Sequence, residues 1–155
     1  MQLADHIQAD LIKVPLKATE KQEAVYELVD LLAEHNLIND SNDVKNAVWQ
    51  RESTRSTGIG HGLAIPHGKT AAAPRLAIAI GIPPQPIEYD SLDNRPVRLI
   101  FLLVSPPDQT GPHIQTLAHI SRLMSNTSIR EAAFEATDAK ALLAIITQSD
   151  PSGVQ

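Results

Sequence analysis

The chain has 155 residues, enough for one domain with a buried core and too few for two. Its formal net charge of -5 comes with no clustered run of Lys and Arg, which argues against a general nucleic-acid-binding protein. The absence of cysteine excludes disulfides and thiolate metal sites, and it fits a reducing cytoplasm.

No segment of the sequence predicts export or membrane insertion. The N-terminal stretch Met1–His6 has neither the basic region nor the long apolar run of a signal peptide. The longest apolar run, Leu99–Val104, is far shorter than the roughly 20 residues that a membrane span needs. We therefore expect a cytoplasmic protein that does not insert into a membrane.

Two helices are predicted in the first third of the chain. A capping-box pattern that begins at Thr19 predicts a helix running to about Glu34. A second helix begins at about Ser41 and carries Arg51 on its apolar face, four residues after Ala47. The core face of the first helix is defined by apolar residues at helical spacing, namely Ala24, Val25, Leu28, Val29 and Leu32.

Strands and helices alternate through the rest of the chain. The apolar run at 97–104 is typical of a central strand covered on both faces. The stretch 105–112 is predicted to be a loop before a helix that starts near His113. Other strands are predicted at 63–65 and 76–82, further helices at 128–136 and 138–147, and a buried stripe on the helix near His113 made of Ile114, Leu117, Ile120 and Met124.

This alternation predicts one α/β domain over residues 1–148, with a mixed or mostly parallel sheet flanked by helices on both faces. The polar residues 149–155 are predicted to form a flexible tail. We find no internal repeat and no linker that would divide the chain into two domains.

The clearest candidate for a functional side chain is His67, which lies between a proline and a glycine. Pro66 fixes the incoming backbone, and Gly68 lets the chain turn without a Cβ atom in the way. We expect a side chain held in this way to be presented to solvent rather than packed in the core. Histidine can accept and release a proton or a phosphoryl group near neutral pH.

Phosphoryl transfer through histidine also needs donors that hold the phosphoryl oxygens. The backbone N–H groups of Gly68 and Lys69 are predicted to form a small anion-binding nest. The hydroxyl groups of Ser56 and Thr57 are two further candidate donors. These residues define the predicted phosphate-binding part of the site.

Two more side chains are predicted to complete the pocket. Arg51 offers a fixed, forked donor, and His113 follows Gly111-Pro112 at a helix start, where the helix dipole favours an anion. A structural interpretation remains open for both residues. Arg51 could lay its stem over the core, and His113 could be a polar residue at a helix N-terminus without a further role.

Two other chemistries are less consistent with the sequence. The glycines at 58, 60 and 62 do not form a dinucleotide fingerprint, because a short strand and Pro66 follow them instead of a helix. A zinc site made of His61, His67 and His113 would lack a known ligand spacing and an acidic companion. His61 itself is interpreted as a loop residue that borders the site.

Taken together, the motifs resemble those of enzyme IIA domains of the fructose/mannitol type, from the bacterial phosphoenolpyruvate-dependent sugar phosphotransferase system. The resemblance extends over nearly the whole chain, from about Leu3 to Ile146. The first motif comprises Arg51-Glu52, Ser56-Thr57-Gly58-Ile59-Gly60 and Gly62-Leu63-Ala64-Ile65-Pro66-His67-Gly68-Lys69. The second comprises Pro107, His113-Ile114-Gln115, Leu117-Ala118, Ile120-Ser121 and Leu123.

The resemblance implies a phosphoryl carrier. In that family the residue matching His67 receives a phosphoryl group from a small histidine-carrier phosphoprotein (HPr-like) and passes it to a cysteine of a IIB domain. The residues matching His113 and Arg51 line the same site and support the phosphorylated state. The implied fold is a five-stranded mixed sheet with helices on both sides, and no metal or organic cofactor is implied.

Within the family, the sequence looks most like the free-standing nitrogen-regulatory IIA proteins, in 93–101 and 107–110. The alternative is a sugar-specific IIA that feeds a IIB domain during uptake. A third possibility, a binding module without phosphotransfer, would be indicated by replacement of His67, His113 or Arg51, and all three are present. His61 departs from the asparagine that the family often carries there, which suggests a shifted pH response.

Overall fold

The centre of the fold is the predicted apolar strand, observed as β6 (Leu99–Ser105) in the computed structural model, which describes residues 3–150. Every residue of β6 is buried. The strand pairs antiparallel with β5 (Ala77–Gly81) on one side. On the other side it pairs parallel with β3 (Leu63–Ala64) and then with β4 (His67–Lys69).

Two short strands extend the sheet at its edges. β1 (Ile12–Lys13) pairs parallel with β5, and β2 (Gly58–Gly60) pairs antiparallel with β3, so the order is β1-β5-β6-β3-β2. β4 lies beyond β3 on the same side of β6. β3 and β4 pair with successive parts of the same side of β6, so together they fill one position of the sheet. Counted in this way, the sheet has five positions and mixed pairing, as predicted.

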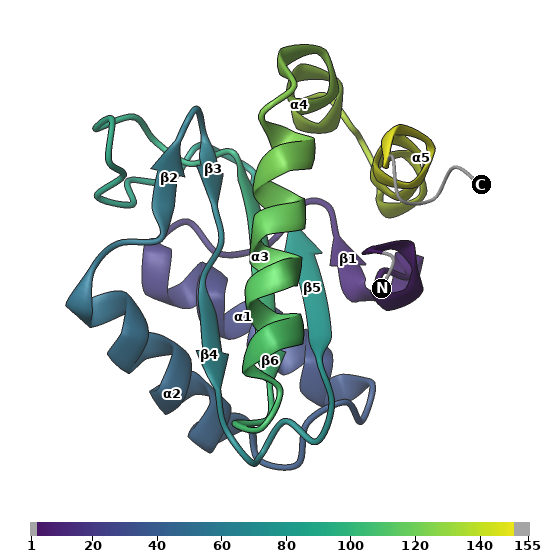
Figure 1. Ribbon diagram of the computed structural model, residues 1–155. Coiled ribbons are helices and arrows are strands. Elements are labelled where there is room, and N and C mark those ends of the chain that lie inside the picture. The colour runs from purple at the N-terminus through teal and green to yellow at the C-terminus, as the bar shows by residue number, and fades with distance from the viewer. Residues whose placement is uncertain (1–2, 151–155) are drawn as a thin grey trace.

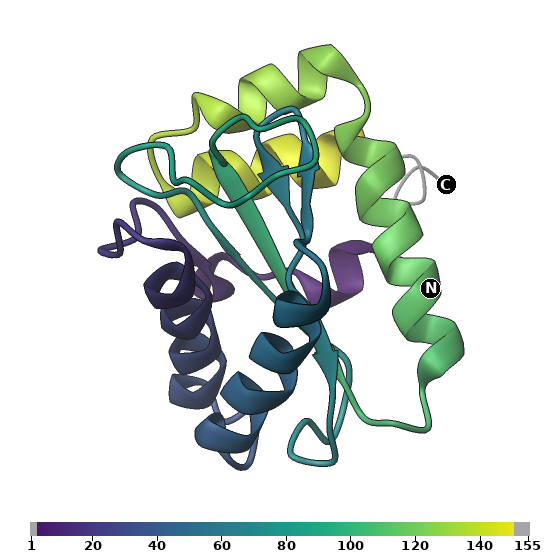
Figure 2. The ribbon, with the colours of Figure 1, turned by 90° about the vertical axis from the view of Figure 1, so that its left-hand side faces the viewer.

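Helices cover both faces of this sheet (Figures 1 and 2). Alternate residues of β6 point to opposite faces, with Leu102 buried on one side and Phe101 on the other. No helix within residues 3–150 is long and apolar enough to cross a membrane. The face of Leu102 is covered by α1 (Lys21–Glu34) and α2 (Ser41–Thr54), and the face of Phe101 by α3 (Thr110–Met124), α4 (Thr127–Phe134) and α5 (Ala139–Ser149). Two short 3-10 helices, Leu3–His6 and Ala9–Leu11, precede β1.

The structure confirms the first two helices but not the predicted cap of the first. Glu20 is the N-cap of α1 and makes no capping hydrogen bond through its side chain, so the capping box at Thr19 is wrong. The helix is instead stabilised by its buried apolar face. α2 begins at the predicted residue, with the Asp40 side chain accepting a hydrogen bond of 3.1 Å from the backbone N–H of Asp43.

α3 begins at Thr110, three residues before the predicted start, so part of the predicted loop at 105–112 is helical. Pro112 is tolerated there because the backbone N–H groups of the first helical turn have no acceptor within the helix, so the N–H that proline lacks is not missed. Gly111 lies in the same turn. The buried face of the helix also differs from the predicted stripe, because it passes through His113 and Thr116 before it reaches Ile120 and Met124. Ile114 is 58% exposed and does not belong to the buried stripe.

The C-terminal helix extends further than predicted. α5 ends at Ser149, and the next residue, Asp150, is fully buried. An oxygen of Asp150 lies 2.6 Å from Nε2 of His119 on α3. Residues 149 and 150 therefore belong to the folded body rather than to the predicted flexible tail, and the remainder of that tail, 151–155, lies outside the described residues.

Candidate functional site

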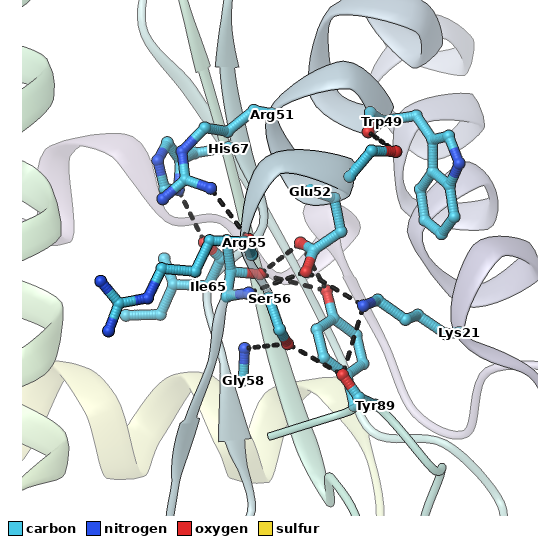
Figure 3. A network of polar contacts seen from close by, with 12 residues as sticks. Lys21, Trp49, Arg51, Glu52, Arg55, Ser56, Gly58, Ile65, His67 and Tyr89 are labelled. Carbon is cyan, nitrogen blue, oxygen red and sulfur yellow. Dashed lines mark hydrogen bonds and ion pairs between the residues drawn. The ribbon is translucent and has the colours of Figure 1, made fainter. Parts of the chain in front are cut away.

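His67 is the first residue of β4 and follows the break that Pro66 makes between β3 and β4. Its ring is half-buried, and Nδ1 lies 2.8 Å from the backbone oxygen of Ile65 (Figure 3). A carbonyl oxygen accepts hydrogen bonds and cannot donate, so Nδ1 must hold the proton. Nε2 therefore keeps its lone pair and is the nucleophilic atom of the neutral ring.

The second predicted histidine lies beside the first. His113 is in the first turn of α3, is 4% exposed, and has its ring centroid 5.5 Å from that of His67. Its Nδ1 lies 2.7 Å from the hydroxyl oxygen of Ser105, the last residue of β6. The end of the central strand thus orients the ring of His113 next to His67.

Both imidazoles are held in the neutral state. Burial lowers the pKa of His67 below its usual 6.5, and the positive charges of Arg51 and Lys69 lower it further. Burial, with His67 and Lys69 as smaller causes, lowers the pKa of His113 to about 4. At neutral pH the ring of His67 therefore has the free electron pair that a nucleophile requires.

Arg51 is in the last turn of α2 and lies at the same site. Its guanidinium donates a hydrogen bond of 2.9 Å to the backbone oxygen of Arg55, which fixes the side chain near His67 (Figure 3). Arg51 and His67 both line a pocket of about 260 Å³. The other lining residues are Arg55, Ser56, Thr57, Ile59, Ile65, Leu92, Leu117 and Ser121.

The hydroxyl groups of Ser56 and Thr57 are hydrogen-bonded within the protein. Ser56 donates to the backbone oxygen of Tyr89 at 2.8 Å, and Thr57 donates to Oε1 of Glu52 at 2.5 Å. Both residues line the pocket, but these bonds hold the segment after α2 against its neighbours. In this structure both hydroxyl groups therefore stabilise the local fold, and the role of Ser56 and Thr57 as phosphate donors stays a prediction.

The predicted nest at Gly68 and Lys69 does not form, because both residues lie in the extended strand β4. Gly68 pairs with Val104 of β6, and a Cβ atom on it would lie 3.1 Å from the backbone nitrogen of Val48. Gly68 therefore allows α2 to pack closely on β4. The Lys69 ammonium donates to the Thr110 hydroxyl at 3.2 Å and contributes positive charge to the site.

Sequence reasoning missed the buried carboxylate of Glu52, which directly follows Arg51 and is 4% exposed. It interacts with Lys21 on α1 and with Tyr89 (Figure 3). It also accepts a hydrogen bond from the backbone N–H of Thr57. The signal available was an acidic residue next to a candidate site arginine. Its partners Lys21 and Tyr89 are too far away in the sequence to be found from spacing.

His61 is not grouped with the other two histidines. It is exposed on the turn between β2 and β3, where its backbone φ is 58° and its N–H donates to Asp93 at 2.8 Å. This left-handed conformation favours asparagine or glycine, which fits the asparagine often found in the family. The turn borders the site, since Ile59 and Ser121 line both the His67 pocket and a neighbouring pocket that includes His61.

The protein is thus an α/β domain in which two neutral imidazoles and a guanidinium lie together where the sheet is interrupted between β3 and β4. Residues 5–149 match the sequence model described as "Phosphoenolpyruvate-dependent sugar phosphotransferase system, EIIA 2". The chain therefore belongs to this family of phosphotransferase IIA domains, and the resemblance found from the sequence is confirmed.

Relatives of two kinds are similar to this chain. A nitrogen regulatory protein of Bradyrhizobium diazoefficiens is 32% identical over 94% of this chain and 95% of its own length. The fructose-specific EIIABC component of Bacillus subtilis is 35% identical over 97% of this chain, but the chain spans only 24% of that relative.

Solved structures agree on the fold. The crystal structure of the nitrogen regulatory protein IIA-Ntr from Neisseria meningitidis matches with a TM-score of 0.86 and 30% identity, over 93% of this chain and 98% of that one. The mannitol IIA of Escherichia coli matches with a TM-score of 0.76 at 20% identity, over 90% of this chain and 98% of that one, and so has the same fold.

Proposed function

We propose that this chain is a phosphoryl carrier of the nitrogen-regulatory type, which accepts a phosphoryl group on Nε2 of His67 from an HPr-like phosphoprotein. The observation that carries the proposal is the hydrogen bond from Nδ1 of His67 to the Ile65 oxygen, because it leaves Nε2 as the nucleophile. The relay would run in the cytoplasm, and its phosphoryl group would come from phosphoenolpyruvate.

The transfer requires one bond to form and one to break. The lone pair on Nε2 of His67 attacks phosphorus, while the bond from phosphorus to the donor's histidine nitrogen breaks and returns its electron pair to that nitrogen. The proton on Nδ1 stays in place, and the Ile65 oxygen stabilises the positive charge that develops on the ring. Arg51 and Lys69 offset the negative charge of the phosphoryl oxygens.

The surface around His67 suits a protein donor. The large apolar side chains exposed among the described residues are Ile59, Leu92 and Ile114. Ile59 and Leu92 line the His67 pocket, and Ile114 lies one turn before Leu117, which also lines it. An apolar rim around a polar centre is the composition expected of a docking surface.

The regulatory role is favoured by the nitrogen regulatory relative and by the IIA-Ntr structure, which is 30% identical to this chain, against 20% for the mannitol IIA structure. The alternative is a fructose/mannitol-type IIA that passes the phosphoryl group to a IIB domain during sugar uptake. The fructose-specific relative supports this alternative. The two roles differ in whether the phosphorylated chain passes its label to the cysteine of a IIB domain from the same cell. Such transfer would favour the alternative. Failure to label any IIB domain of that cell would favour the regulatory role.

The direct test is incubation with enzyme I, HPr and labelled phosphoenolpyruvate. We expect one acid-labile phosphoryl group on the wild-type chain and none on His67→Ala, because the nucleophile is removed. His61→Ala is the matched control, since that ring lies outside the His67 pocket, and it should be labelled like wild type. Label that persists in His67→Ala would contradict the assignment.

A further inference from the structure

We propose that Glu52 is a positioning residue for the phosphoryl transfer: its buried carboxylate holds the segment after α2 so that the Arg51 guanidinium stays beside His67. This inference rests on the proposed function. It assigns a role in the reaction to a residue that does not line the His67 pocket.

The carboxylate of Glu52 joins three separate segments of the chain. Oε2 accepts a hydrogen bond of 2.7 Å from the backbone N–H of Thr57 and lies 3.2 Å from the ammonium of Lys21 on α1. Oε1 accepts 2.5 Å and 3.2 Å hydrogen bonds from the hydroxyl groups of Thr57 and Tyr89. The end of α2 is therefore fastened to α1, to the segment that follows α2 and to the loop of Tyr89.

The segment fixed by Glu52 includes the group that holds Arg51. The guanidinium of Arg51 donates to the backbone oxygen of Arg55. That oxygen lies between the end of α2 and Thr57, whose backbone N–H and hydroxyl are both held by Glu52. The carboxylate thus determines where the Arg55 oxygen lies, and through it the direction of the guanidinium toward His67 (Figure 3).

Stability alone does not explain a charge at this place. Removing a carboxylate from water is costly, and a buried ion pair is often no more stabilising than apolar side chains of the same volume. Here the carboxylate accepts from four donor groups. The Lys21 ammonium also donates to the backbone oxygen of Tyr89 at 3.2 Å and lies 4.4 Å from the centroid of the Tyr89 ring. So many directional contacts determine geometry more than they add free energy.

Glu52 also acts on His67 through its charge. Arg51 lowers the pKa of His67, and the negative charge of Glu52 opposes that effect. Removing the Glu52 charge alone would therefore lower the pKa of His67 further, whereas movement of the Arg51 guanidinium away from the ring, the larger of the two charge effects, would raise it. A purely structural contact elsewhere in the fold would leave this pKa unchanged.

The test is the substitution Glu52→Gln, which keeps the size of the side chain but removes its charge and one acceptor oxygen. We expect the maximal rate of phosphorylation by HPr to fall by roughly 10²-fold, the loss typical of a misplaced catalytic group. The HPr concentration at half-maximal rate should change much less, because the apolar rim is intact. Because the displaced guanidinium outweighs the lost carboxylate charge, an NMR titration of the ring should give a pKa of His67 above the wild-type value, and a lower pKa would show that Arg51 has stayed in place.

Glu27→Gln is the matched control. Glu27 is also a carboxylate that accepts backbone N–H groups, at 3.0 Å from Lys17 and 2.9 Å from Ala18, and it pairs with Lys13 at 2.8 Å. It has no contact with the segment after α2. This variant should lose stability yet keep the wild-type phosphorylation rate and the wild-type pKa of His67.

The outcomes separate this inference from the proposed function. If the wild-type chain takes no phosphoryl group, the proposed function fails. If wild type is phosphorylated and folded Glu52→Gln matches its rate, the positioning role fails. If Glu52→Gln does not fold, Tyr89→Phe is the second variant, because it removes one donor to Glu52 and keeps the ring beside Lys21. Its phosphorylation rate should be lower than that of Glu27→Gln. Equal rates in these two variants would overturn the proposal.

Discussion

At the scale of single residues, one hydrogen bond determines the chemistry of His67. The oxygen of Ile65 keeps the proton on Nδ1, and burial together with Arg51 and Lys69 lowers the pKa of the ring. The ring is therefore neutral and holds its proton on Nδ1, as the proposed transfer requires.

Arg51 is the residue whose removal should affect the reaction with least effect on the fold. We expect Arg51→Ala to slow phosphorylation by about 10²-fold through the loss of an oriented donor. The guanidinium is at the surface of α2, so the urea midpoint should change little. Arg75→Ala, which removes an exposed arginine outside the pocket, serves as the control, and an equal rate in both variants would remove Arg51 from the site.

His113 makes a prediction about acid stability. Its pKa is lowered from 6.5 to about 4, so between these values the unfolded chain binds a proton that the folded chain does not. The contribution of neutral His113 to the free energy of unfolding is fully present above pH 6.5. It decreases as the pH falls and stops changing below about pH 4. The loss from this one ring is on the order of 3 kcal/mol.

We expect His113→Gln to lack this part of the acid dependence, since its amide does not titrate. Urea unfolding at several pH values gives the free energy of unfolding of both proteins. The wild-type value should fall more steeply than the variant value between pH 6.5 and 4. Parallel curves would mean that His113 titrates normally in the folded state.

At the scale of elements, the close packing of α2 on β4 keeps Arg51 near His67. Gly68→Ala would bring a Cβ atom to 3.1 Å from the backbone nitrogen of Val48, so the helix must shift. We expect a loss of about 1–3 kcal/mol in the free energy of unfolding and a slower phosphorylation. The control is Gly111→Ala, because nothing lies within 4 Å of that position.

Gly111→Ala in the helix α3 should leave the stability unchanged or raise it by up to about 1 kcal/mol. Chemical denaturation and the HPr assay measure both effects. If Gly68→Ala is as stable and as active as Gly111→Ala, then α2 is not held at the distance that the structure gives.

Sequence patterns were sufficient for elements with a strong internal signal. The continuous apolar run gave β6, and apolar spacing gave α1 and α2. The start of α3 was missed because Gly111 and Pro112 have the composition of a loop, although the first turn of a helix accepts both. Patterns therefore located elements well and their ends less well.

At the scale of the whole molecule, the site depends on contacts between distant segments. His67 and His113 could be named from their neighbours in the sequence, but their approach to a centroid distance of 5.5 Å depends on β4 and α3 both meeting the end of β6. The partners of Ser56 and Thr57 were missed for the same reason. A free hydroxyl and one bonded to a distant residue look alike in the sequence.

The proposed function depends on one atom, Nε2 of His67, and NMR of the phosphorylated protein with ¹⁵N-labelled histidine shows which ring nitrogen carries the phosphorus. We expect phosphorus–nitrogen coupling to Nε2 of His67, with Nδ1 still protonated and donating to the Ile65 oxygen. Phosphorus on Nδ1 of His67, or on the ring of His113, would contradict it.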